Sequence, residues 1–180
     1  MIFPKPYADF VQRLRVAYGF VLLAAFATLS KPTMEALWIG LPVSLLGLAI
    51  RAWAAGHLEK NRQLTTSGPY AWVRNPLYVG TLLAALGVVI ASRSIALTVV
   101  FAIAFLLVYL PVIELEEQHL RSLFPDYGVY ADRVYRLVPL RRWPARSKAF
   151  SWAVYRRNKE HKAALGFVVA LAWLVIRLPR

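Results

Sequence analysis

The sequence contains no cysteine, and only 9 of its 180 residues are acidic against 22 that are basic. The lack of cysteine excludes a disulfide framework, a thiolate nucleophile and a metal site built on thiolates. Charged residues make up only 17% of the chain, whereas 59% are hydrophobic, more than a soluble domain usually carries. An apolar chain with a formal net charge of +13 predicts a membrane protein with basic loops. A nucleic-acid-binding patch is the alternative source of such charge, and the long apolar runs argue against it.

Five apolar runs predict an all-α, polytopic fold with about five transmembrane helices in one domain, residues 1–180. The runs cover residues 16–29, 36–55, 77–91, 95–113 and 163–178. Several are shorter than the roughly 20 residues that cross a bilayer squarely. Flanking Tyr, Trp and Arg side chains can anchor such helices and extend their reach. The alternative for the short runs is a half-spanning or interfacial helix.

Basic residues alternate between the predicted loops. The first and third connections carry only Lys31 and Arg93, whereas segment 114–162 holds half of the 22 basic residues. The second connection and the N-terminal segment are also basic. By the positive-inside rule, these three basic regions share the cytoplasmic side. The sequence therefore predicts a multi-pass protein whose functional face is cytoplasmic.

The stretch "TTSGPYAWVRNPLYVG", residues 65–80, holds unusual chemistry for a membrane loop. Gly68-Pro69 breaks the chain, and Asn75-Pro76 is typical of a helix start, with Asn75 at the N-cap. A helix N-terminus presents free N–H groups and a positive dipole end to an anion. Arg74 adds a planar fork for a carboxylate or phosphate. Nearby aromatic faces suit a cation such as a sulfonium, so the loop predicts a zwitterionic ligand. In the simpler interpretation, Asn75-Pro76 only caps the helix. The remaining residues are then ordinary interfacial anchors: Arg74, Tyr70, Trp72 and Tyr78.

Three carboxylates, Glu114, Glu116 and Glu117, follow the fourth apolar run at the predicted cytoplasmic edge. Carboxylates there oppose the positive-inside trend and are functional candidates, with Arg74 or Arg51 as possible partners. The alternative is a solvated amphipathic turn.

Further along, Tyr127, Tyr130 and Val134 are spaced as one face of a short amphipathic helix lying on the membrane. Residues 140–162 are basic with interspersed aromatic residues, which predicts anchoring to anionic lipid.

The histidines His57, His119 and His161 are too scattered for a metal site, and we predict none. His57 lies at the end of the second run, where it either reaches the functional face or is an ordinary interfacial residue. On the third run, Gly80, Ala84 and Gly87 form one small face that permits close helix packing.

Two motifs, "GPYAWVRNPLYVG" and "EEQHLRSLFPDYGVY", are separated by one helical hairpin. In this arrangement the chain resembles the isoprenylcysteine carboxyl methyltransferase family, a pattern that phospholipid N-methyltransferases share. The resemblance covers about residues 50–139, followed by the basic segment 140–162 and a C-terminal helix over 163–178. One position departs from it, because Asn75 stands where the family has His, and Asn cannot act as an imidazolium. The matching positions are Gly68, Tyr70, Arg74, Pro76, Tyr78, Gly80, Glu116, Glu117, Leu120, Phe124, Tyr127 and Tyr130.

The resemblance implies methyl transfer from S-adenosylmethionine to a lipophilic acceptor at the membrane. The implied acceptor is the carboxylate of an isoprenylcysteine-like substrate, or alternatively the amine of a phospholipid. Two alternatives from other functional classes are a sterol-reductase-like enzyme and a non-enzymatic membrane scaffold. The implied catalytic residues are Arg74, Glu116 and Glu117. The implied cofactor-binding residues are Tyr70, Arg74, Asn75, Pro76, Tyr78, Glu116, Glu117, Tyr127 and Tyr130.

Overall fold

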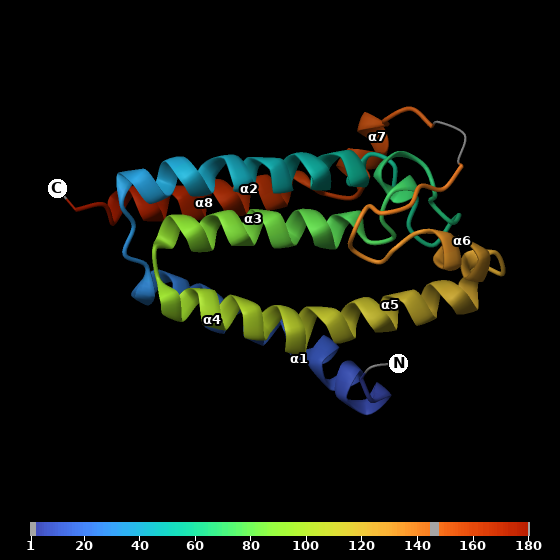
Figure 1. Cartoon of the computed structure of the whole chain (residues 1–180), viewed down its shortest axis with the longest axis horizontal. Coiled ribbons are helices and arrows are strands. Elements are labelled where there is room, and N and C mark those ends of the chain that lie inside the picture. The colour runs from blue at the N-terminus through green and yellow to red at the C-terminus, as the bar shows by residue number, and fades with distance from the viewer. Residues whose placement is uncertain (1–2, 145–147, 180) are drawn as a thin grey trace. The chain divides into compact units, whose positions relative to one another are not determined.

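The computed structural model describes residues 3–144 and 148–179, apart from the side chains of residues 15 and 16. Over these residues the chain is helical and contains no strand, which confirms the all-α prediction (Figure 1). The long helices are α1 (Lys5–Leu29), α2 (Met34–Ala55), α3 (Pro76–Ser92), α4 (Ile95–Ala104), α5 (Leu110–Leu123) and α8 (His161–Ile176). The shorter elements are the 3-10 turn η1 (Gly68–Ala71), the π-helical stretch η2 (Phe105–Tyr109), α6 (Tyr127–Arg133) and α7 (Trp152–Arg157).

Each of the five apolar runs lies in a helix. Among the described residues, α2 and the continuous helix Ile95–Leu123 are long and apolar enough to cross a bilayer. The two arms of α1, which meet at a bend of 59°, count as a third candidate if they form one span. Both α3 and α8 are apolar but shorter than these helices. Two or three membrane spans are therefore supported, and a five-span topology stays a prediction.

The chain divides into two compact units. Unit 1 comprises Met1–Ser44, Ala85–Gln118 and Phe167–Arg180, and unit 2 comprises Leu45–Ala84 and His119–Gly166. Helices α2, α3, α5 and α8 each contribute residues to both units.

The core of unit 1 joins the first half of α2 to the ends of α3 and α8. Leu37, Ala91 and Leu174 are buried together, and Phe26 and Leu171 pack against them. Small residues bring α2 and α3 together here, since a Cβ added at Gly40 would strike the backbone of Gly87 and Ala91.

In unit 2 the same two helices also meet through small residues. A Cβ added at Gly47 of α2 would collide with the backbone of Gly80 and Ala84 on α3. The small face predicted on α3 is therefore confirmed as a helix-packing surface, of the kind that lets apolar helices approach closely.

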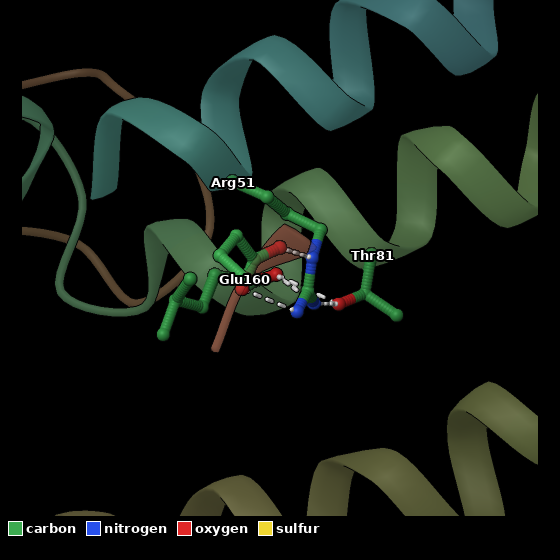
Figure 2. Close-up of polar contacts among 4 residues, drawn as sticks. Arg51, Thr81 and Glu160 are labelled. Carbon is green, nitrogen blue, oxygen red and sulfur yellow. Dashed lines mark hydrogen bonds and ion pairs between the residues drawn. The ribbon is translucent and has the colours of Figure 1, made fainter. Parts of the chain in front are cut away.

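A partly buried polar cluster in unit 2 ties α2 to the start of α3 and to the segment before α8 (Figure 2). Arg51 of α2 donates to both carboxylate oxygens of Glu160, from Nε at 2.5 Å and from Nη2 at 3.0 Å. Its Nη1 donates to Thr81 Oγ1 and to the carbonyl of Leu77, both on α3. Arg51 was predicted as a possible partner of the carboxylates on α5; its observed partner is Glu160, immediately before α8.

The segment before α8 caps the C-terminal end of α2. Asn158 Nδ2 donates to the carbonyls of Ala55 and Leu58, at 2.8 and 2.9 Å. The N–H of Ser151 donates to the carbonyl of Gly56. Ala55 is the last residue of α2, and the last carbonyls of a helix have no partner inside it, so the bond from Asn158 satisfies a group that would otherwise need water.

Candidate functional site

The loop before α3 begins with a turn that only glycine fits well. Gly68 has φ +59°, and a Cβ there would lie 2.7 Å from the ring of His57. Pro69 then occupies the first turn of η1, where its missing N–H is no loss. The buried residues Pro69, Tyr70 and Ala71 follow as one compact 3-10 turn.

Helix α3 starts where the sequence predicts it. Pro76 is its first residue, and the carbonyl of Asn75 accepts from the N–H groups of Tyr78 and Val79. Asn75 is buried and holds the N-cap position, because an N-cap residue provides the first carbonyl of the helix. Its side-chain nitrogen lies 3.5 Å from the carbonyl of Arg136.

The loop is held along its length by the segment that follows α6. The N–H of Arg74 donates to the carbonyl of Tyr135 at 2.9 Å, and that of Asn75 donates to Arg136 at 3.2 Å. Further along, the N–H of Trp143 donates to the carbonyl of Ala71 at 2.7 Å. Two segments about 60 residues apart in the sequence, both inside unit 2, are thus paired through their backbones.

The two tyrosines of the second motif support this pairing. Tyr130 Oη donates to the carbonyl of Tyr70 at 2.6 Å, and its ring packs edge-on against Tyr127 and Trp143. Tyr127, Tyr130 and Val134 form a buried cluster. The prediction that this face of α6 lies on the membrane is therefore wrong, because it packs against the protein. The face itself was identified correctly, and cofactor contact by the two tyrosines stays a prediction.

Arg74 lies at a cavity beside α6. Its side chain is half-buried, and Nη1 donates to the carbonyl of Ala131 at 2.6 Å. The cavity has a volume of about 300 Å³ and is lined by Arg74 and residues 131–136. Arg133 and Arg136 add positive charge to its wall, against the single carboxylate of Asp132. Such a lining suits an anionic group such as a carboxylate.

The carboxylates of α5 belong to unit 1. Glu114 and Glu117 are buried, at 5% and 4% exposure, whereas Glu116 is exposed. Glu114 Oε2 accepts from the N–H of Phe3 at 3.2 Å. Burial distinguishes Glu117 from Glu116 as the inward-facing member of the motif pair. Closure of the ligand site by these carboxylates stays a prediction.

From the sequence, Arg133 and Arg136 are predicted to face either lipid headgroups or the ligand site, and both line the cavity. The other contacts of the wall formed by residues 131–136 were not predicted. Most of the contacts that build this wall are made by backbone carbonyls. Every residue has a carbonyl, so no residue type in the sequence indicates these contacts.

His57 does not reach this cavity wall. Its ring is buried, with Nδ1 2.9 Å from the carbonyl of Trp53 and Nε2 3.1 Å from that of Lys148. Among the described residues, no group of three or more His, Asp or Glu side chains lies close enough to hold a metal ion.

Comparison with known proteins gives one family and two relatives. A family model described as phospholipid methyltransferase matches residues 42–127. The chain is 37% identical to the cobalt-zinc-cadmium resistance protein CzcN of Cupriavidus metallidurans, covering 69% of this chain and 61% of that protein. It is 33% identical to the nickel-cobalt-cadmium resistance protein NccN of Alcaligenes xylosoxydans xylosoxydans, covering 76% and 70% respectively.

The chain thus spans less than two thirds of the length of the first relative. No solved structure matches the chain significantly. The family match covers the whole loop before α3, the hairpin that follows and the carboxylates of α5.

Proposed function

Because the chain belongs to the integral membrane methyltransferases that include the phospholipid and isoprenylcysteine carboxyl methyltransferases, we propose that it transfers a methyl group from S-adenosylmethionine to a lipophilic acceptor. The observation that carries the proposal is the position of Arg74. This motif residue faces a positively walled cavity immediately before an apolar helix. The donor brings a carboxylate, an amine and a sulfonium, so a basic cavity near aromatic rings matches its chemistry.

The protein's own part in this reaction is alignment. Direct displacement at a methyl carbon needs no covalent enzyme nucleophile and no metal, because the work is to hold acceptor, methyl and sulfur in line and to exclude water. When bound, the donor supplies an electrophilic methyl group. Arg74 is proposed to bind a carboxylate. The loop around the donor is proposed to be shaped by Tyr70, Asn75, Pro76 and Tyr78. Glu117 is proposed to bind the donor's amine or ribose, as the motif implies.

Binding of the product analogue S-adenosylhomocysteine tests the proposal. Calorimetry on the purified chain is expected to give a saturable heat, which Arg74→Ala and Glu117→Ala each weaken at least tenfold, since a charge-assisted hydrogen bond contributes about 1.5–3 kcal/mol. Arg62→Ala removes an exposed arginine from the connection before the loop and serves as the matched control. No heat with the wild-type chain would rule out the methyltransferase assignment.

Two acceptors are supported by different observations. If Arg74 orients the acceptor instead of the donor's carboxylate, the positive wall around it favours a carboxylate acceptor, as on an isoprenylcysteine. The description of the matching family model favours a phospholipid amine. Radiolabelled methyl transfer separates them, because a methyl ester releases volatile methanol in base whereas an N-methyl group is retained.

A physiological role in metal resistance is proposed from the printed names of both relatives. In the host organism, loss of the gene should increase sensitivity to cobalt and cadmium. The wild-type chain should restore growth, and Arg74→Ala should not. Equal rescue by both chains would separate any role in resistance from methyl transfer.

A further inference from the structure

One surface of unit 2 pairs arginines with exposed aromatic rings. The guanidinium of Arg142 lies 5.1 Å from the ring centroid of Trp72, and that of Arg141 lies 5.6 Å from Tyr135. Trp72 and Tyr135 are each 42% exposed, and both arginines are exposed. Stacking over a ring holds each cation at the surface at little cost in side-chain freedom.

Exposed aliphatic side chains complete the same segment. Leu140 is 69% exposed and Val138 is 51% exposed. A single exposed leucine needs no explanation, but apolar groups gathered beside aromatic rings and cations usually mark an interaction surface. We call this the Arg–aromatic surface: Trp72, Tyr135, Val138, Leu140, Arg141 and Arg142.

The charge of this segment has one sign. Residues 133–142 contain four arginines and no acidic residue. Its partner must therefore be anionic, and it must also accept apolar side chains.

The backbone places this surface at the start of an apolar helix. Arg74 and Asn75 donate to the carbonyls of Tyr135 and Arg136, and α3 begins at the next residue, Pro76. The surface therefore lies where the chain changes from a polar loop to an apolar helix of 17 residues. Tryptophan, tyrosine and arginine concentrate at that level of a membrane.

We propose that the Arg–aromatic surface binds the anionic headgroups of the membrane leaflet that it faces. The arginines contact lipid phosphates, while Trp72, Tyr135 and Leu140 enter the boundary between headgroups and acyl chains. A nucleic acid would satisfy the charge but would leave the aliphatic residues beside an apolar helix without a partner. The proposal requires neither a methyl donor nor an acceptor, so it stands independently of the methyltransferase assignment.

Native mass spectrometry of the full chain, titrated in detergent with phosphatidylglycerol or phosphatidylcholine of the same acyl chains, tests this surface. The wild-type chain should bind phosphatidylglycerol more tightly. Arg141→Gln/Arg142→Gln should reduce that preference by roughly 25-fold, at about fivefold for each arginine. Arg141→Lys/Arg142→Lys keeps the positive charge and should retain most of the preference for phosphatidylglycerol. Circular dichroism confirms that each variant is folded.

The matched control is Lys31→Gln/Arg93→Gln, which removes two exposed cations from unit 1 and should leave the lipid preference unchanged. An equal loss in the control would indicate a net-charge effect and overturn the proposal. So would a wild-type chain without preference for phosphatidylglycerol. Displacement of the lipid by an equal concentration of inorganic phosphate would indicate a small anion pocket instead, and would also overturn it.

Discussion

At the scale of single residues, the loop before α3 depends on a few positions where chemistry leaves little choice. Gly68 combines a left-handed backbone conformation with close contact to the ring of His57. The hydroxyl of Tyr130 donates to the carbonyl of Tyr70 and ties the loop to α6. The shape of the loop is thus set in part by the backbone conformation of Gly68 and by the hydrogen bond of Tyr130.

Gly68→Ala should destabilise the protein by about 1–3 kcal/mol, because alanine is strained at positive φ and its methyl group would clash with the ring of His57. Thermal unfolding in detergent measures the loss. Gly166→Ala is the control, since a Cβ there meets nothing within 4 Å and the residue lies within α8. It should leave stability unchanged or raise it by up to about 1 kcal/mol. Equal melting temperatures for Gly68→Ala and the wild-type chain would refute the strain argument.

Tyr130→Phe removes one buried hydrogen bond and keeps the ring packing. It should cost about 1 kcal/mol in stability and weaken S-adenosylhomocysteine binding, because the loop loses its tie to α6. Calorimetry and thermal unfolding measure the two effects. Tyr155→Phe, whose ring packs against Phe150 and Trp152 in the same unit, is the matched control and should change neither quantity. Unchanged affinity in Tyr130→Phe would show that loop shape does not depend on this bond.

Residue types predicted some of this site and not the rest. Asn75-Pro76 predicted the start of α3 because proline and asparagine have strong positional preferences at helix N-termini. The two shorter hydrogen bonds that pair residues 74–75 with 135–136 join backbone groups. Every non-proline residue has these backbone groups, so residue types do not predict the pairing, and it became visible only with the fold.

At the scale of elements, hydrophobic length predicted α2, α3 and α8 to within two residues at either end. It placed the start of α1 too late, at residue 16 instead of Lys5. Polar residues such as Asp9 and Arg13 interrupt the apolar run there without preventing a helix. Beyond its apolar length, the fourth run continues as the amphipathic α5 to Leu123. The break Phe124-Pro125-Asp126 predicts the end of this helix at the position where the structure has it.

The Arg51–Glu160 pair is the element-scale feature that fixes α2, α3 and the segment before α8. Glu160→Gln should cost about 3 kcal/mol, the low end for a broken buried pair, because Arg51 keeps 21% exposure. Chemical unfolding measures this cost.

The exposed pair Lys148–Glu59 provides the matched control for Glu160→Gln. Its separation is 3.3 Å, and its lysine side chain is 55% exposed. Glu59→Gln should cost less than about 1 kcal/mol. Equal costs for the two substitutions would contradict the structural role assigned to Glu160.

At the scale of the whole molecule, the alternation of basic loops predicts which loops share a side of the membrane. The absence of cysteine makes the natural chain a ready background for labelling. In intact cells, a cysteine at Lys31 or Arg93 should react with a membrane-impermeant maleimide. One at Lys60 or Arg62 should react only after permeabilisation. Labelling of all four in intact cells would contradict the predicted topology.

The central claim, methyl transfer to a lipophilic acceptor, is tested most directly by one measurement. Purified chain in lipid vesicles is incubated with S-adenosylmethionine carrying a tritiated methyl group, together with a prenylcysteine analogue and phosphatidylethanolamine. We predict tritium in the organic extract with the wild-type chain, at least tenfold less with Arg74→Ala, and wild-type levels with Arg62→Ala. No transfer by a folded wild-type chain to either acceptor, or equal transfer by Arg74→Ala, would contradict the account.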